Sequence, residues 1–264
     1  MSTLNFEVIL LLVTKDNGVT IIQFTGESTT KSFSREFLPK IRDVILENIG
    51  CKAIVLTGEG NFFSAGADIN AFKESIDAKD SVDLIRELTG ILHPLLLKMR
   101  TSSTIFVAAL NGASAGGGLG LALACDIRIA SPNGKMAASY AGMGLSPDGG
   151  TTWLLPRLVG EQKSRRFFLE NQVWTAEEAC YNGAIDEVVA ADKLISRAVQ
   201  IAKRWSRWGE HTKEATKHLL LVQNDNDFET HLKHERTLIE AAGTTKEFAE
   251  GVNAFLEKRQ PDFS

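Results

Sequence analysis

The sequence predicts an α/β protein in which strands and helices alternate along the chain. Short apolar runs such as Ala53–Thr57 and Ile105–Leu110 have the length of buried strands, and segments with helical spacing separate them. Glycine-rich turns follow two of these runs. From Lys163 onward the spacing is helical throughout. This alternation is typical of helices layered on a sheet, and we expect a core domain over 1–190 and a helical region over 191–264.

The individual elements follow from apolar spacing and from turn residues. Asn17 and Gly18 favour a tight hairpin between the first two strands. Strands are expected at 6–13, 19–24, 53–57, 105–110 and 126–130. Helices are expected at 34–48, 81–99 with an interruption or bend near Pro94, after the glycine turn at 116–118, and at 163–170, 176–181, 193–207, 212–222 and, interrupted, 226–259.

Composition restricts the class of protein. The chain has 264 residues, 44% of them hydrophobic, which is enough for a sizeable core. A net charge of -4 without a basic block argues against a nucleic-acid partner. Cys51, Cys125 and Cys180 are too scattered to suggest disulfides or a zinc site. No run approaches the roughly 18 apolar residues of a membrane span, so we expect a cytoplasmic protein without a membrane partner.

Two glycine-rich turns are candidates for binding an anion. One reads N-G-A-S-A-G-G-G (111–118), and the other reads F-F-S-A-G-A-D-I (62–69). Glycine lets backbone N–H groups approach a ligand without an intervening Cβ. The first N–H groups of a helix also lack intrahelical partners and lie at the positive end of its dipole. Together the turns could stabilise a tetrahedral oxyanion or a thioester enolate, although either alone could be an ordinary strand-to-helix loop.

Two other motifs in the same region suggest different chemistry. The stretch around Ser114 matches the G-x-S-x-G nucleophile elbow of hydrolases, and Asp148 and a later histidine would follow in hydrolase order. A hydrolase does not explain the Ser-Ala-Gly-Ala-Asp turn or the extra glycines. A dinucleotide site is also disfavoured, because Leu121 occupies the third glycine position of G-x-G-x-x-G.

Four motifs in a fixed order carry a more specific resemblance. They are S-A-G-A-D-I (64–69), N-G-x-x-x-G-G-G-L-G (111–120), G-L-S-P-D-G-G (144–150) and L-P-R-L-V-G (155–160). With these motifs the chain resembles the enoyl-CoA hydratase/isomerase (crotonase) superfamily over nearly its whole length, closest in pattern to the isomerase-like members. The match is weakest at 25–28, where relatives carry an Asn-Arg-Pro-like turn. The resemblance implies the crotonase (ClpP-like) spiral of ββα units with a helical C-terminal region.

The same resemblance implies the partners. The substrate would be an acyl-CoA thioester, and no separate cofactor or metal is expected because coenzyme A is part of the substrate. Relatives form homotrimers or dimers of trimers, so a homo-oligomer is expected. The region 191–264 would serve oligomerisation and cover the CoA site, with Phe255 and Lys258 near a neighbouring subunit's CoA.

Site residues are carried over by position. The backbone N–H groups of Ala67 and Gly117 would hold the thioester oxygen, and Asp148 would be the catalytic acid and base. Contacts to the substrate are expected from Phe63, Ala65, Asp68, Ile69, His93, Gly116, Tyr140 and Leu145. Asp68 also suits the N-cap of a helix.

The reaction follows from what the catalytic positions hold. The two glutamates of the hydratases align with Gly120 and Tyr140, neither of which is a carboxylate. One carboxylate can take a proton from one carbon and return it to another, so the resemblance implies isomerisation of 3-enoyl-CoA to 2-enoyl-CoA or of a ring-containing acyl group. Pro-Asp-Gly is also a common turn sequence. A hydratase-like enzyme, another lyase or hydrolase, a nucleophilic Asp148 as in related dehalogenases, and a non-catalytic acyl-CoA binder remain alternatives.

Overall fold

Two sheets form the centre of the protein. The computed structural model describes residues 11–263. The larger sheet has six strands in the order β1 (Leu11–Asp16), β2 (Val19–Phe24), β3 (Ala53–Thr57), β5 (Ile105–Leu110), β7 (Ile127–Ala130) and β10 (Glu187–Val188). The smaller sheet has the order β4 (Phe62–Ser64), β6 (Ala113–Ala115), β8 (Lys135–Ala137) and β9 (Val173–Thr175). Pairing is parallel except between β1 and β2 and between β8 and β9.

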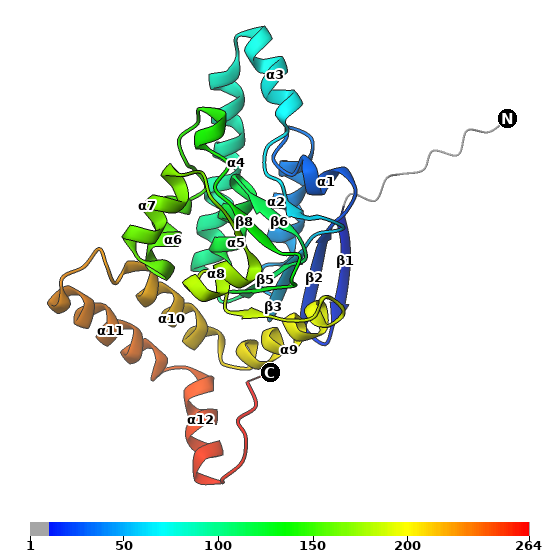
Figure 1. Cartoon of the computed structure of the whole chain (residues 1–264). Helices are drawn as coiled ribbons and strands as arrows, with labels where there is room; N and C mark the ends of the chain where they lie inside the picture. The colour runs from blue at the N-terminus through cyan, green and yellow to red at the C-terminus, as the bar shows by residue number, and fades with distance from the viewer. Residues whose placement is uncertain (1–10, 264) are drawn as a thin grey trace.

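Helices surround these sheets and continue beyond them (Figure 1). In chain order they are α1 (Glu27–Thr30), α2 (Phe37–Asn48), α3 (Ile69–Ala78), α4 (Ser81–Thr101), α5 (Gly117–Ala124), α6 (Thr151–Val159), α7 (Glu161–Leu169), α8 (Ala176–Asn182), α9 (Leu194–Ser206), α10 (Glu210–Val222), α11 (Phe228–Ala242) and α12 (Lys246–Leu256), with 3-10 turns η1 (Ala141–Met143) and η2 (Ala191–Lys193). The expected α/β class is confirmed. Part of the first expected strand, 6–10, lies outside the described residues. No helix in the range 11–263 combines the length and the apolar character needed to cross a membrane.

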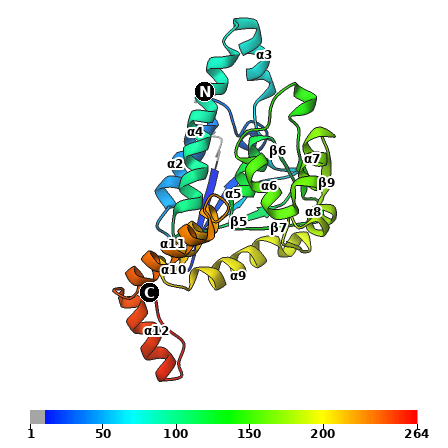
Figure 2. The same ribbon diagram turned by 90° about the vertical axis from the view of Figure 1, so that its left-hand side faces the viewer.

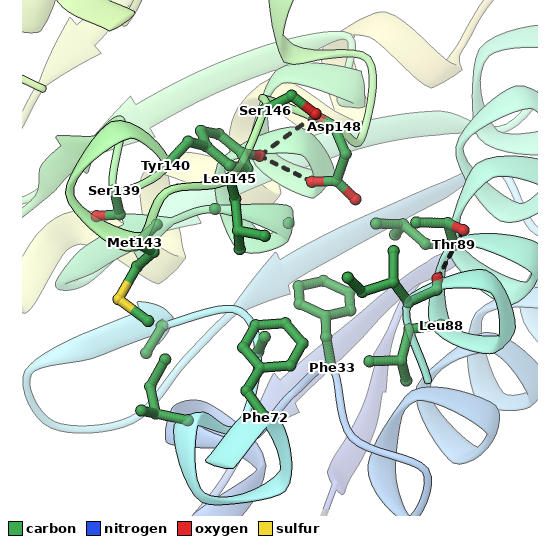
Figure 3. A pocket seen from close by; sticks show the side chains of 18 of the residues that line it. Phe33, Phe72, Leu88, Thr89, Ser139, Tyr140, Met143, Leu145, Ser146 and Asp148 are labelled. Carbon is green, nitrogen blue, oxygen red and sulfur yellow. Dashed lines mark hydrogen bonds between the residues drawn. The ribbon is translucent and has the colours of Figure 1, made fainter. Parts of the chain in front are cut away.

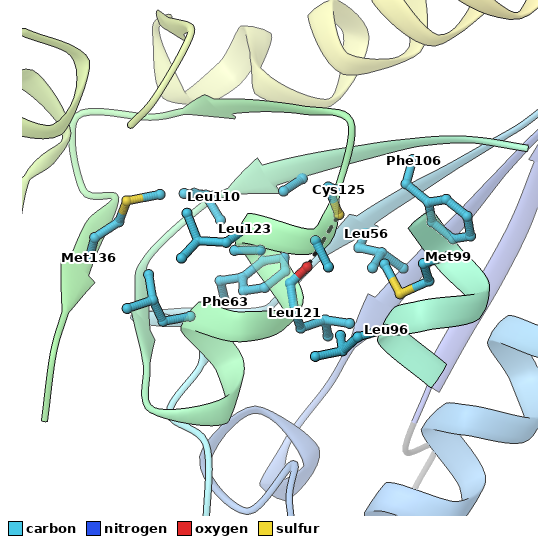
Figure 4. Close-up of a cluster of buried hydrophobic side chains, with 14 of the residues drawn as sticks. Leu56, Phe63, Leu96, Met99, Phe106, Leu110, Leu121, Leu123, Cys125 and Met136 are labelled. Carbon is cyan, nitrogen blue, oxygen red and sulfur yellow. Dashed lines mark hydrogen bonds between the residues drawn. The ribbon is translucent and has the colours of Figure 1, made fainter. Parts of the chain in front are cut away.

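The central strands of the larger sheet are buried on both faces. Along β3, Ile54 and Leu56 belong to a core cluster that includes α2, α4 and α5, whereas Ala53 and Val55 belong to a second cluster that includes α9. This is the period-two alternation of a strand with helices on both faces. Figure 4 shows the first cluster, in which Phe63 of β4 and Phe106 of β5 pack with leucines of α4 and α5.

Helix α4 runs unbroken through Pro94, so the expected interruption is not present. A proline inside a helix removes one backbone hydrogen bond. On both sides of Pro94 the helix is held by buried leucines, among them Leu88, Leu92, Leu95 and Leu96. Tertiary packing therefore maintains the helix across the proline.

The C-terminal region is helical but does not pack as one unit. Helix α9 lies against β3 and β5 and contributes Ala198 and Ala202 to the second core cluster. The boundary expected near residue 190 thus precedes a helix that completes the core. Helices α10 and α11 follow, and α12 projects away from both sheets in the two views of Figures 1 and 2.

Lys217 fastens α10 to the core. Its buried ammonium donates to the main-chain oxygens of Met99 at 2.9 Å and Thr104 at 2.8 Å, and to Asp126 Oδ2 at 3.0 Å. Met99 lies in the last turn of α4, where carbonyl groups lack intrahelical donors. Burial lowers the pKa of Lys217, and the nearby Asp126 carboxylate opposes that effect.

We expect Lys217→Met to lower the free energy of unfolding by about 3 kcal/mol or more, because Asp126 and two carbonyl groups lose a buried partner. Urea unfolding measures the change. The matched control is Lys233→Met, which removes an exposed ammonium paired with Glu229 and should cost less than about 0.5 kcal/mol. Equal effects of the two substitutions would contradict a fastening role for Lys217.

Candidate active site

Three turns meet at one edge of the smaller sheet. Strands β4, β6 and β8 run parallel to one another, so their carboxyl ends lie side by side. Residues 65–68 follow β4, Gly116 follows β6, and residues 138–150 follow β8. These turns and one face of α4 enclose a cavity of about 440 Å³. It is lined by Phe33, Leu38, Ala65, Ala67, Ile69, Phe72, Ile85, Leu88, Thr89, Leu92, Ala115, Gly116, Gly117, Ser139, Tyr140, Met143, Leu145, Ser146 and Asp148 (Figure 3).

Two residues that line this cavity have backbone N–H groups without a partner in the described part of the chain. Ala67 lies in the turn after β4, and Gly117 is the first residue of α5. Among residues 11–263 neither N–H is engaged in a hydrogen bond. Gly66 has a positive φ of 85°, and a Cβ there would lie 2.6 Å from the Ala115 oxygen. Only glycine at 66 lets the two turns approach so closely, and Ala67 and Gly117 both line the cavity.

Asp148 provides the carboxylate of the cavity. Its Oδ1 accepts a hydrogen bond from the Tyr140 hydroxyl at 3.1 Å. Its Oδ2 lies 3.8 Å from His93 Nε2, and that nitrogen accepts a hydrogen bond from the Gly149 N–H at 3.4 Å. One carboxylate oxygen is therefore held by Tyr140, while the other is the candidate proton acceptor. Figure 3 shows the carboxylate on the cavity side of the loop with Tyr140 beside it.

Tyr140 is built to act as a hydrogen-bond donor. Its side chain is 6% exposed, and its hydroxyl also lies 3.2 Å from the Asp148 main-chain oxygen. Burial, followed by the negative charge of Asp148, raises the pKa of Tyr140 above the usual value for tyrosine. The hydroxyl therefore keeps its proton well above neutral pH.

Gly120 is closed to any side chain. It lies on α5, where the family resemblance implies the first glutamate of a hydratase, and a Cβ there would lie 2.5 Å from the Gly149 oxygen. The loop that carries Asp148 thus packs directly on the α5 backbone. A glutamate cannot occupy this position unless the loop moves.

Most of the predicted substrate contacts lie on the cavity. Its lining includes Ala65, Ile69, Gly116, Tyr140 and Leu145 along with the three predicted catalytic positions. His93 is outside the lining but reaches Asp148 from α4.

One predicted contact needs correction. Phe63 is fully buried and packs edge-on against Phe24 at a centroid distance of 5.8 Å, because the alternation of β4 turns it into the core. Asp68 caps α3 by accepting from the Asn70 N–H at 2.9 Å, as its sequence position also suggested. It does not line the cavity, and its contact with the CoA part of a substrate stays a prediction.

The sequence reasoning missed the apolar walls of the cavity. Phe33 and Phe72 form one side, and Ile85, Leu88 and Leu92 form another (Figure 3). The last three are spaced by three and four residues, so they share one face of α4. That spacing was a usable signal, whereas nothing in the local sequence marks Phe33 as a cavity residue.

The nucleophile-elbow interpretation of Ser114 is wrong. The side chain is fully buried in β6, and its hydroxyl donates to the Lys135 oxygen at 3.0 Å. A substrate cannot reach this oxygen, because Ser114 lies beneath the turn that presents Gly116 and Gly117.

We expect Tyr140→Phe to lower the turnover number about tenfold with little change in KM, because the carboxylate loses the bond that fixes its orientation. Steady-state kinetics on an acyl-CoA substrate measures both constants. In the unmodified protein, the raised pKa of Tyr140 predicts no loss of activity from its ionisation between about pH 7 and pH 9. A fall over that range that disappears in Tyr140→Phe would contradict the donor role.

The fold and the cavity together define the class of protein. Paired backbone donors and one carboxylate beside apolar walls suit a carbonyl compound whose oxygen gains negative charge when an adjacent C–H bond loses its proton. Comparison with known proteins agrees: the family model described as enoyl-CoA hydratase/isomerase matches residues 14–264. The chain belongs to this family, the crotonase superfamily, and it is an enzyme of that superfamily with the crotonase fold.

Its relatives include different reactions. The chain is 30% identical to 1,2-epoxyphenylacetyl-CoA isomerase of Escherichia coli K12, over 94% of this chain and 96% of the relative. It is 27% identical to 2,3-dehydroadipyl-CoA hydratase of the same organism, over 96% and 98%. Among solved structures, Pseudomonas aeruginosa DspI is 32% identical, with a TM-score of 0.85 and full coverage of both chains. The family is therefore established, while isomerase and hydratase relatives occur side by side.

Proposed function

We propose that this enzyme isomerises the double bond of an acyl-CoA thioester, from 3-enoyl-CoA to 2-enoyl-CoA or in a ring-containing acyl group. The observation that carries the proposal is the single carboxylate of the cavity. Asp148 is the only acidic or basic side chain in the cavity lining within residues 11–263. Addition of water by the two-glutamate route needs a second carboxylate, and Gly120 and Tyr140 occupy both candidate positions.

The proposed mechanism uses the two backbone donors to hold the thioester and the Asp148 carboxylate to move the proton. The thioester oxygen accepts hydrogen bonds from the N–H groups of Ala67 and Gly117. Asp148 Oδ2 removes a proton from the carbon α to the thioester, and the negative charge moves to the oxygen between these donors. One such donor is worth about 3–4 kcal/mol of transition-state stabilisation. Asp148 then delivers the proton to the γ carbon, so that the carboxylate is regenerated and no other reactant is consumed.

The residues of the cavity walls favour a substrate whose acyl group is uncharged. Phe33, Phe72, Leu88 and Leu92 present apolar surface, and the described lining contains no lysine or arginine. A second carboxylate on the acyl chain would be desolvated without a counter-charge. We therefore expect an aliphatic or aromatic acyl group and no turnover of a dicarboxylic acyl-CoA.

Incubation with a 3-enoyl-CoA in deuterated water tests the proposal. The expected product is the 2-enoyl-CoA, with deuterium at the α or γ carbon to the extent that Asp148 exchanges its proton with solvent. Mass spectrometry and proton NMR follow both changes. The absence of both the double-bond shift and deuterium incorporation would overturn the proposal. A 3-hydroxyacyl-CoA product from a 2-enoyl-CoA would establish a hydratase instead.

We also propose that the enzyme assembles as a homotrimer or a dimer of trimers. The projecting helices carry apolar side chains that the single chain leaves exposed, among them Ile239 on α11 and Phe248, Val252 and Phe255 on α12. Phe255 is 84% exposed. Exposed apolar patches of this kind mark protein contacts. Sedimentation equilibrium should give a multiple of three subunits, and a monomer at micromolar concentration would contradict the assembly.

A further inference from the structure

A second cavity has the end of α5 in its lining, where the first cavity has the start of that helix. Its volume is about 530 Å³, and its lining includes residues of α6, of the end of α9 and of α10. Its lining includes Arg100, Asp126, Trp153, Trp205, Trp208 and Lys213. None of these residues lines the catalytic cavity, and the proposed isomerisation uses none of them.

The walls of this cavity are apolar and aromatic. Trp153 lies on α6, Trp205 lies in the last turn of α9, and Trp208 lies just after that helix. Leucines of α5, α6 and α10 complete the walls. Three of the four tryptophans of the chain are thus gathered around one space, which suits the apolar part of a small molecule.

The polar part of the lining is strongly cationic. It holds five arginine and lysine residues but one acidic residue, Asp126. Arg128 is paired with Asp186 at 3.3 Å. Asp126 is shared by Lys217 at 3.0 Å and Arg100 at 3.8 Å, so one carboxylate faces two cations. Arg100 Nε is also buried without a hydrogen-bond partner in the described chain.

Lys213 is the cation that the fold leaves without a partner. The residue is 7% exposed, yet among residues 11–263 its ammonium has no hydrogen bond or ion pair. Burial lowers its pKa most; Glu210 and Glu247 oppose this from a distance, while Lys52 and Lys217 add to it. The ammonium is not among the buried side-chain atoms that lack a hydrogen-bond partner in the described chain, so it keeps contact with solvent and is open to an anion that enters the cavity.

We propose that this cavity is a second ligand site, which binds a small amphipathic organic anion with its carboxylate on Lys213 and its apolar body between the tryptophans and leucines. Charge and shape both contribute. A small inorganic anion would leave the walls empty, whereas a neutral apolar molecule would leave Lys213 unpaired. The site is independent of the proposed isomerisation, so either can fail without the other.

Octanoate tests the site, with octanamide as the uncharged probe of the same shape. Tryptophan fluorescence is the readout, because three tryptophans line this cavity and none lines the catalytic one. We expect a saturable change with octanoate and a dissociation constant at least about tenfold weaker for octanamide, the loss of one charge-assisted bond. Equal affinities of the two probes, or no fluorescence change with octanoate, would overturn the proposal.

Substitution at 213 gives a second, independent measurement. Lys213→Met keeps the side-chain stem but removes the charge, and it should weaken octanoate at least about tenfold while Lys213→Arg retains binding. Lys193→Met, an exposed lysine paired with Asp192, is the control and should bind octanoate normally. Should Lys213→Met dissociate the oligomer without weakening octanoate, the anion on Lys213 comes from a neighbouring subunit and the ligand site is refuted.

Discussion

Asp148→Asn should lower kcat/KM for a 3-enoyl-CoA by about a hundred- to ten-thousand-fold, the range that a positioned general acid and base contributes. Asparagine has nearly the same shape and its oxygen can still accept from the Tyr140 hydroxyl, so the loop should keep its structure. It cannot take a proton from carbon. Acyl-CoA affinity, measured by calorimetry, should remain within a few-fold of the unmodified protein, because the two backbone donors are untouched.

The control for this substitution is Asp192→Asn, which changes an exposed aspartate in η2 far from the cavity and should leave kinetics unchanged. Full turnover by Asp148→Asn would exclude Asp148 as the base. If Asp148→Asn loses both turnover and acyl-CoA binding, the role of Asp148 is to maintain the structure of the loop, and proton transfer by this residue is not supported.

Gly120→Glu should fail to create a hydratase and should destabilise the fold by about 2–4 kcal/mol. The substitution restores the residue type that hydratases carry there, but its Cβ would lie 2.5 Å from the Gly149 oxygen and 3.1 Å from the Gly149 Cα. Relief of this collision displaces the loop next to Asp148, so isomerisation should fall as well. Urea unfolding and assays of both reactions measure these three effects.

Gly90→Glu is the matched control, because Gly90 is also helical and a Cβ there meets nothing within 4 Å. It should stabilise the protein slightly, by up to about 0.5–1 kcal/mol, since glycine is a poor helix former. A stable Gly120→Glu protein that hydrates 2-enoyl-CoA would show that the loop adapts, and the close packing at Gly120 would then no longer explain why the cavity holds a single carboxylate.

Much of the fold followed from patterns that local sequence carries. The buried runs at β3 and β5 and the glycines at 116–118 predicted strands, turns and the start of α5, because the burial of a strand and the approach of a backbone both restrict residue type. The family resemblance, not this restriction, gave Gly117 as a donor, and that role stays a prediction. The restriction did not locate Phe63, since a strand of three residues is too short to reveal which of its faces points into the core.

The relation between Asp148, Tyr140 and His93 could not be predicted in this way. These side chains come from a loop and from α4, and their distances depend on how β8 and α4 lie relative to each other. The packing of α9 on β3 could not be predicted either, because it also depends on tertiary structure. The spacing of apolar residues shows which face of a helix is apolar, but it does not show which element that face packs against. Lys213 is the clearest example of what the sequence does not show. Its neighbours in the sequence are those of an exposed lysine on a charged helix, yet the residue is buried.

Lys217 links two parts of the protein that have separate tasks. Helix α4 provides a wall of the catalytic cavity. The main-chain oxygen of Met99 in its last turn accepts a hydrogen bond from the ammonium of Lys217, which lies on α10, the first of the C-terminal helices α10 to α12. A shift of α10 therefore acts on the last turn of α4 through the hydrogen bond from Lys217 to Met99, and on the segments at Thr104 and Asp126 through the other two. Helix α10 and one wall of the cavity are therefore mechanically connected, even though no residue of α10 lines the cavity.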